Sequence, residues 1–270
     1  MLDSAIARVR SGKNFHDMYI YLYDNFLRQK KYDSVVKIME TRLTDFGIAG
    51  KIIRLQNFTN AAAIVDEEMK RGASTIVIVG NDATFGRVLS MAATRDILFG
   101  FLPVGHGNTI AQVLGIPVGE EAADILSRRR KVKLDVGWFN NRYFVNQLYI
   151  PASEIQVEYD EKFIVSVPRG KIELVVCNLQ PFVWRDTKKK EYKVHPQDGK
   201  LEAFLRPVVK KGFFKKKLES PSIFPFEEMI VKSKKPFIVK ADGRESKEIK
   251  IKIKLAKRRI QMVVGKERRF

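Results

Sequence analysis

A chain of 270 residues, 45% of them hydrophobic, is long enough for one large or two modest domains and is globular rather than disordered in composition. No apolar run approaches the length of a membrane span, and residues 1–13 lack the apolar stretch of a signal peptide, so we expect a cytoplasmic protein. The single cysteine, Cys177, excludes an intramolecular disulfide framework and fits a reducing compartment.

The formal net charge of +19 is concentrated in the second half of the chain. Residues 186–217 carry eleven Lys and Arg against four Asp and Glu, and residues 231–270 carry fifteen against four. Such a basic field fits an anionic membrane surface, a nucleic acid or a polyanionic ligand, and it equally fits a solvated lysine-rich surface. No nucleic-acid recognition module is evident, so we expect no nucleic-acid partner.

The first half of the chain alternates predicted strands with predicted helices. Continuous β-branched runs such as Ile76–Val79 indicate strands that are buried on both faces. The strands are expected at Met18–Tyr23, Lys51–Leu55, Ile76–Val79 and Ile97–Leu102, and the helices at Lys31–Phe46, Thr59–Arg71, from near Phe85, after Asn108, and at Glu120–Arg128. This alternation predicts a Rossmann-like open parallel sheet with helices on both faces. We expect a helix or a loose arm before it, over residues 1–17.

From about Lys133 the pattern changes to strands without intervening helices. Strands are expected at Lys133–Phe139, Tyr143–Ile150, Ile155–Tyr159, Phe163–Val167, Ile172–Asn178 and Ile249–Leu255. In the last of these, isoleucine and lysine alternate, which is typical of a strand with one buried face and one basic outer face. We therefore predict an α/β domain over residues 1–134 and an antiparallel β-sandwich over residues 135–270, with the boundary near Asp135.

Two predicted strands run directly into tight loops that each lead into a helix. Gly80–Thr84 follows the Ile76 strand, and Pro103–Asn108 follows the next one, with Thr84 and Asn108 as plausible N-caps. Because the carboxyl ends of neighbouring parallel strands meet at one edge of the sheet, the two helix N-termini are expected to form an anion site from backbone N–H groups. The sequence therefore predicts phosphate binding.

These loops carry a resemblance to a known family. Gly80-Asn81-Asp82-Ala83-Thr84 resembles the Gly-Gly-Asp-Gly-Thr loop of the diacylglycerol kinase catalytic family, and Pro103–Thr109 resembles its Pro-x-Gly-Thr-x-Asn-Asp loop. Leu114–Pro117 matches the tail that follows, and Asp242-Gly243 resembles the downstream Asp-Gly-Glu element. The resemblance implies a nucleotide-binding α/β domain, a β-sandwich, and an active site between them. It implies an ATP- and Mg²⁺-dependent kinase of a lipid hydroxyl, peripheral at an anionic membrane surface; an oligomer is compatible with it.

The resemblance also implies roles for individual residues. Asp82 would lie beside the triphosphate and its metal, as catalytic residue and metal ligand, and Asp242 would deprotonate the lipid hydroxyl. His106 stands in place of the family's loop threonine. The residues expected to hold the nucleotide are Gly80, Asn81, Asp82, Thr84, Gly105, His106, Gly107 and Asn108.

The chain departs from the family pattern in several places. Ala83 replaces a glycine, where we expect strain and crowding of a phosphate. Tyr23–Leu27 lacks the family's nucleotide-holding turn, and Pro151–Gly170 replaces a helical insertion of the lipid pocket. Arg244 replaces a glutamate, and near Asp198 a guanidinium is expected in place of the structural Mg²⁺ of some bacterial members. The alternative is therefore a catalytically degenerate member that binds nucleotide or anionic lipid without turnover.

Overall fold

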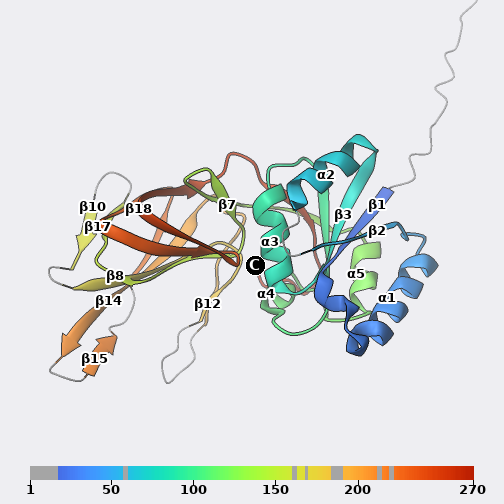
Figure 1. Ribbon diagram of the computed structural model, residues 1–270, viewed down its shortest axis with the longest axis horizontal. Coiled ribbons are helices and arrows are strands. Elements are labelled where there is room, and N and C mark those ends of the chain that lie inside the picture. The colour runs from blue at the N-terminus through green and yellow to red at the C-terminus, as the bar shows by residue number, and fades with distance from the viewer. Residues whose placement is uncertain are drawn as a thin grey trace, which may run out of the picture.

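The computed structural model describes residues 18–56, 60–159, 163–167, 170–183, 191–211, 215–218 and 222–270. The arm expected over residues 1–17 lies outside the described residues. Figure 1 shows two parts, an α/β domain with its helices around a sheet and an extended domain of strands. Within the described part of the chain, no helix has both the length and the apolar character needed to cross a bilayer.

The first domain is built on a six-stranded sheet in the order β2-β1-β3-β4-β19-β5, parallel except where β19 pairs with β5. Helices α1 and α5 pack together, as do α2 and α3, so that both faces of the sheet are covered (Figure 1). The strands are β1 (Met18–Tyr23), β2 (Lys51–Arg54), β3 (Ala73–Gly80), β4 (Leu98–Pro103), β5 (Lys131–Leu134) and β19 (Ile260–Val263). The helices are α1 (Asp33–Asp45), α2 (Ala61–Lys70), α3 (Asp82–Ala92), α4 (Thr109–Val113) and α5 (Ala122–Ser127), with 3₁₀ turns η1 (Asn25–Arg28) and η2 (Lys30–Tyr32) before α1.

The core of this sheet follows from the β-branched and aromatic runs. The side chains of Ile76–Val79 in β3 are completely buried, and those of β4 are nearly so. Strands buried on both faces explain why their sequences are continuous rather than alternating in hydrophobicity. The predicted α/β domain is confirmed in class and in the order of its elements.

The second domain is an antiparallel sheet of eleven strands, whose main path runs β15-β14-β11-β8-β17-β18-β6-β7. Strands β9, β10 and β16 pair alongside this path. The eleven strands are β6 (Gly137–Phe139), β7 (Arg142–Phe144), β8 (Gln147–Ser153), β9 (Gln156–Tyr159), β10 (Phe163–Ser166), β11 (Lys171–Cys177), β14 (Leu201–Lys211), β15 (Lys215–Leu218), β16 (Ser222–Phe226), β17 (Glu228–Ala241) and β18 (Arg244–Leu255). A separate pair comprises β12 (Phe182–Val183) and β13 (Glu191–Tyr192).

The alternation predicted for β18 is correct with one exception. Ile251 and Ile253 are fully buried, whereas Ile249 is 58% exposed. Ile249 falls where the register between β17 and β18 shifts, between the pairs of Lys232 with Lys250 and of Phe237 with Glu248. A register irregularity bends the strand locally and turns one side chain away from the core.

The chain crosses from the first sheet to the second between Leu134 and Gly137, but it also returns. Sequence reasoning assigned all of residues 135–270 to the second domain, whereas β19 lies inside the first sheet, between β4 and β5. After β19 the backbone continues along α4, where Gly265 donates to the carbonyl of Leu114 and Arg269 to that of Val113. The first domain is therefore assembled from two separate stretches of sequence.

Candidate functional site

The loop after β3 is fixed by the way in which α3 begins. The helix starts at Asp82, and its N-cap is Asn81, whose side-chain oxygen accepts from the N–H groups of Ala83 and Thr84. The Thr84 hydroxyl lies 3.4 Å from the Asn81 N–H and completes a capping box. The prediction of Thr84 as N-cap was wrong, because the helix begins three residues earlier, at the N-cap Asn81. Asparagine is a preferred N-cap residue, and the N–H groups of Ala83 and Thr84 donate to its side chain.

Ala83 is not strained at this position. It lies in the first turn of α3, and it is absent from the residues with positive φ. The glycine-like backbone expected here was therefore wrong, because the loop closes by starting a helix and not by a left-handed turn.

The carboxylate of Asp82 connects this loop to the next one. Both of its oxygens lie 3.1 Å from the N–H of Ile110 in the first turn of α4. Burial raises the pKa of the Asp82 carboxyl from its usual 3.8 to about 6, against the opposing effect of N–H groups at the start of α4. Asp82 thus caps α4, the role that Asn108 was expected to have; Asn108 occupies the N-cap position, but its Nδ2 donates to the Gly105 carbonyl at 2.7 Å.

The backbones of the two loops are joined as well. The Asp82 N–H donates to the Gly107 carbonyl at 3.0 Å, and the Val104 N–H donates to the Gly80 carbonyl at 2.7 Å. Gly105 has a φ of +86° and packs against Phe26 and Tyr32, so a side chain there would be both strained and crowded. His106 is exposed at the tip.

The N–H groups that were expected to bind an anion therefore have partners within the protein. At the start of α3, those of Asp82, Ala83 and Thr84 are all used, and at α4 the Asp82 carboxylate takes that of Ile110. The predicted juxtaposition of the two loops is present. The N–H groups at the start of α3 and that of Ile110 are not free, because the Gly107 carbonyl and the side chains of Asn81 and Asp82 supply their acceptors.

Asp242 lies in the two-residue turn between β17 and β18. It and Gly243 have φ values of +45° and +79°, as the tight turn of a β-hairpin requires. The Asp242 carboxylate is 8% exposed and accepts from the N–H groups of Val145 at 2.6 Å and Asn146 at 3.1 Å, with Gln147 at 3.3 Å. Burial raises its pKa from 3.8 to about 7 despite these donors and the nearby Arg244.

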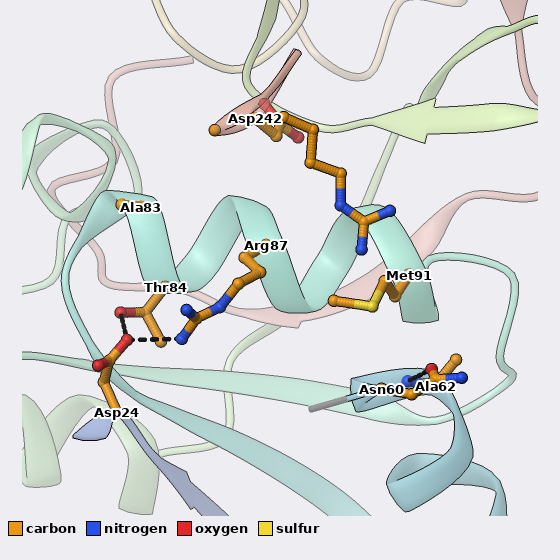
Figure 2. Close-up of a pocket in the computed structure, with 10 residues that line it drawn as sticks. Asp24, Asn60, Ala62, Ala83, Thr84, Arg87, Met91 and Asp242 are labelled. Carbon is orange, nitrogen blue, oxygen red and sulfur yellow. Dashed lines mark hydrogen bonds and ion pairs between the residues drawn. The ribbon is translucent and has the colours of Figure 1, made fainter. Parts of the chain in front are cut away.

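The two domains meet closely at this turn. A Cβ on Gly86 of α3 would lie 2.9 Å from Asn146 Nδ2 and 3.0 Å from Asp242 Cβ. Glycine at this helix position therefore lets α3 reach the Asp242 loop, and Figure 2 shows Asp242 just beyond α3.

A cleft of about 820 Å³ opens between the domains beside α3 (Figure 2). Two of the predicted site residues, Thr84 and Asp242, line it, which brings together residues that are far apart in the sequence. The lining residues are Asp24, Asn60, Ala62, Ala83, Thr84, Arg87, Met91, Asp242, Gly243 and Arg244. The Gly105–Asn108 loop adjoins Asp82 but supplies none of these described lining residues.

Sequence reasoning missed two charged residues of the cleft, Asp24 and Arg87. Asp24 Oδ2 accepts from the Thr84 hydroxyl at 2.6 Å and from Arg87 Nη2 at 2.7 Å (Figure 2). Asp24 directly follows β1, at the edge of the sheet where ligands of open α/β sheets bind, and Arg87 lies three residues after Thr84 on the same helix face. The position of Asp24 at the end of a parallel strand and the spacing of Arg87 from Thr84 are the sequence features that could have predicted their place in the cleft.

The donor set does not fit a protein-held Mg²⁺. Asp82 faces the start of α4, Asp24 is paired with Arg87 and Thr84, and Asp242 accepts three N–H groups. Among the described residues, no three His, Cys, Asp or Glu side chains are grouped as a metal site would need. Mg²⁺ requires near-octahedral oxygen ligands, and carboxylates already turned to internal donors do not present them.

The guanidinium expected at Asp198 pairs with a different carboxylate. Arg259 Nε lies 2.6 Å from Asp135 Oδ1, while Asp198 accepts from the Lys200 N–H at 3.0 Å. Asp135 precedes Asp198 by 63 positions but is brought beside it by the fold, since Gly199 donates to Asp135. Nearby Glu202 is buried, and burial raises its pKa to about 7.

A small apolar cavity of about 210 Å³ lies in the second domain, lined by Val157, Tyr159, Phe163, Val165, Leu205, Phe224 and Met229. Met229 lies near the start of β17 and Asp242 directly follows its end, which places them on the order of 40 Å apart at about 3.3 Å per residue. Figure 1 accordingly shows β10 at the far end of the second domain from α3. The cavity is separate from the cleft.

Comparison with known proteins agrees with this architecture. Residues 21–139 match the family described as the diacylglycerol kinase catalytic domain. The chain is 29% identical over 104 residues to a diacylglycerol kinase of Staphylococcus haemolyticus, covering 37% of this chain and 31% of that protein. It is 32% identical over 89 residues to a probable lipid kinase YegS-like of Pseudomonas aeruginosa, covering 32% and 30%. The chain thus aligns with about a third of the length of these curated relatives.

Solved structures extend the likeness of fold to nearly the whole chain. The crystal structure of a diacylglycerol kinase from Bacillus anthracis superposes with a TM-score of 0.74, over 93% of this chain and 97% of that one, at 16% identity. The likeness is one of fold, an α/β domain joined to a domain of antiparallel strands. In sequence, residues 21–139 are similar to the diacylglycerol kinase catalytic domain, and the rest of the chain is similar to the solved structure in fold.

Proposed function

We propose that this protein is an ATP-dependent kinase that phosphorylates a lipid hydroxyl of the diacylglycerol type. The observation that carries the proposal is the cleft in which Thr84, at the start of α3, and Asp242, from the second domain, face one space. Phosphoryl transfer needs this arrangement, because the protein mainly has to position a phosphate donor against an acceptor hydroxyl.

Asp242 is the proposed general base. A base works best when its pKa lies near the working pH, and burial raises the pKa of Asp242 to about 7. Three N–H groups hold its carboxylate in one orientation, so that its remaining lone pairs can accept the proton of the acceptor hydroxyl.

The nucleotide is proposed to lie along the two joined loops, with its phosphates at Asn81–Thr84 and its remaining part towards Gly105–Asn108. Mg²⁺ would arrive as part of the nucleotide complex, where it offsets phosphate charge, since the carboxylates of the site do not form a ligand set. Asp82 holds the two loops in register through α4, so Asp82→Asn should raise the apparent ATP constant and slow turnover. Isothermal titration and initial rates would measure the two effects.

The basic second half is proposed to bring the enzyme to its substrate. Its two basic segments account for nearly all of the net charge, and lipid hydroxyls are presented at membranes with anionic headgroups.

The test is a radiolabelled-ATP assay over a panel of lipids. Wild type should label a lipid, and Asp242→Asn should lower turnover by about 10²–10⁴-fold, with ATP affinity within about twofold. Asp96→Asn is the matched control, because Asp96 is exposed outside the cleft and only accepts a bond from Gln261. A wild type that labels no lipid would contradict the proposal.

A second candidate is favoured by the internal hydrogen bonds that the carboxylates of Asp24, Asp82 and Asp242 already accept. In this reading the protein binds nucleotide or anionic lipid without turnover. ATP would then raise the melting temperature, by an amount equivalent to about 2.7 kcal/mol at a hundredfold excess over its dissociation constant. The same assay would give no phosphorylated lipid, and Asp242→Asn would change nothing measurable.

A further inference from the structure

The cleft contains side chains of both charges, but they differ in how far they are engaged. Asp24 and Arg87 come from the first domain, and Asp242 and Arg244 from the second. The two acids have their partners inside the protein, as described above. The charged groups of the cleft that remain available to a ligand are therefore the two arginines.

Arg87 is held in place and is still accessible. Its Nη2 lies 2.7 Å from Asp24 Oδ2, and its side chain is 31% exposed, compared with 14% for Asp24. Among the described residues the other N–H groups of its guanidinium have no hydrogen-bond partner. A guanidinium has five donors in a fixed plane, so one ion pair fixes its direction and leaves donors for an anion.

Arg244 approaches from the other domain. It follows the Asp242–Gly243 turn, is exposed, and forms no hydrogen bond or ion pair with another described residue. Its charge acts on Asp242 only through space. Arg244 is thus a cation at the rim of the cleft without a fixed partner.

Several other donors at the cleft are already used. The N–H groups of Ala83 and Thr84 are bonded to the Asn81 side chain, and those of Ala62 and Ala63 to Asn60 at the start of α2. The Thr84 hydroxyl donates to Asp24. The charged donors left for a ligand in this part of the structure are Arg87 and Arg244.

We propose that Arg87 and Arg244 form a polyphosphate site across the cleft, and that this site binds its ligand without a metal ion. The inference rests on the proposed function for the identity of the site and adds how the phosphates are held. Arginine suits the task because its fork of donors pairs with two phosphate oxygens at once. One arginine from each domain would hold a chain of phosphates in the cleft beside α3.

The experiment measures binding of inorganic tripolyphosphate and of ATP by isothermal titration, each in excess EDTA and in excess Mg²⁺. Wild type should bind both probes in EDTA, with dissociation constants within about threefold of those in Mg²⁺. Affinity should fall steeply as salt is added, because the contacts are ionic. The difference between the binding free energies of ATP and tripolyphosphate gives the contribution of the nucleoside to binding.

Single variants then test the two arginines. Arg244→Gln and Arg87→Gln should each weaken tripolyphosphate binding by about tenfold or more, the usual cost of losing a charged hydrogen-bond partner. Arg87→Lys should recover part of the loss, since it keeps the charge. Arg142→Gln is the control, because Arg142 is 48% exposed, is not among the residues that line the cleft, and lies 3.4 Å from Glu248 and over the Phe139 ring. Arg244 is an exposed turn residue, so its variant tests the proposal even if Arg87→Gln fails to fold.

The outcomes separate this inference from the proposed function. Binding that requires Mg²⁺, or binding that Arg244→Gln leaves unchanged, would overturn the arginine site even if the protein phosphorylates a lipid. Metal-free binding that is lost in both variants would support it, even if no lipid is labelled and the proposed function fails.

Discussion

Replacing Asp242 with asparagine tests whether the buried carboxyl group has a raised pKa. The test uses the pH dependence of the free energy of unfolding and needs no activity. The pKa of this carboxyl is 3.8 when it is free and about 7 in the folded protein, because burial disfavours its charge. Between these values the unfolded chain has released the proton while the folded chain keeps it. The folded state therefore binds more protons, and its stability falls as the pH rises through this window.

The size of the effect follows from the same two values. The full difference corresponds to roughly 4 kcal/mol at about 1.36 kcal/mol per pKa unit, and the part lost between about pH 5 and pH 8 is roughly 2–3 kcal/mol. Asparagine does not titrate. Its amide accepts on one side only, so one of the N–H groups of Val145, Asn146 and Gln147 loses its acceptor, at a cost of about 1–3 kcal/mol.

The assay is urea denaturation of both proteins across this pH range, and the difference between the two curves isolates Asp242 from all other titrating groups. Wild type should be clearly more stable near pH 5, and its advantage should shrink or reverse by pH 8. An advantage that stays constant or grows with pH would refute the reasoning. It would mean that the three N–H groups favour the carboxylate more than burial opposes it.

Three further predictions concern the same surfaces. Gly86→Ala should destabilise the protein by about 1–3 kcal/mol and slow turnover, because its methyl would meet Asp242 across the domain interface; thermal unfolding with unchanged stability would contradict this close contact. Ala83→Gly should lower stability by up to about 1 kcal/mol rather than relieve strain, since Ala83 is helical; a raised melting temperature would argue otherwise. Binding to vesicles with anionic lipid, measured by co-sedimentation, should weaken steeply with salt, and equal binding to neutral vesicles would remove the membrane proposal.

Sequence reasoning performed best where the signal is local. The continuous run at Ile76–Val79 and the alternation along Ile251 and Ile253 each depend on neighbouring residues, and each has the expected structure. The two strand-to-helix loops could also be placed together, because carboxyl ends of neighbouring parallel strands must share an edge.

The parts that were missed depend on contacts between distant residues. Asp82 was expected to face a ligand, but its partner is the N–H of Ile110, 28 residues away. The pairing of Asp24 with Arg87 spans 63 residues and carries no periodic pattern. Whether an acid faces solvent, a metal or a helix N-terminus is decided by the packing of loops, which a single sequence does not reveal.

The return of β19 to the first sheet has a consequence for how the molecule is made and divided. Residues 260–263 separate β4 from β5, and Ile260 and Met262 are fully buried. During synthesis the ribosome supplies this strand only after the strands of the second domain, so the sheet of the α/β domain becomes continuous only once the second domain has been made. A fragment ending at residue 134 would leave the edges of β4 and β5 unpaired and prone to association.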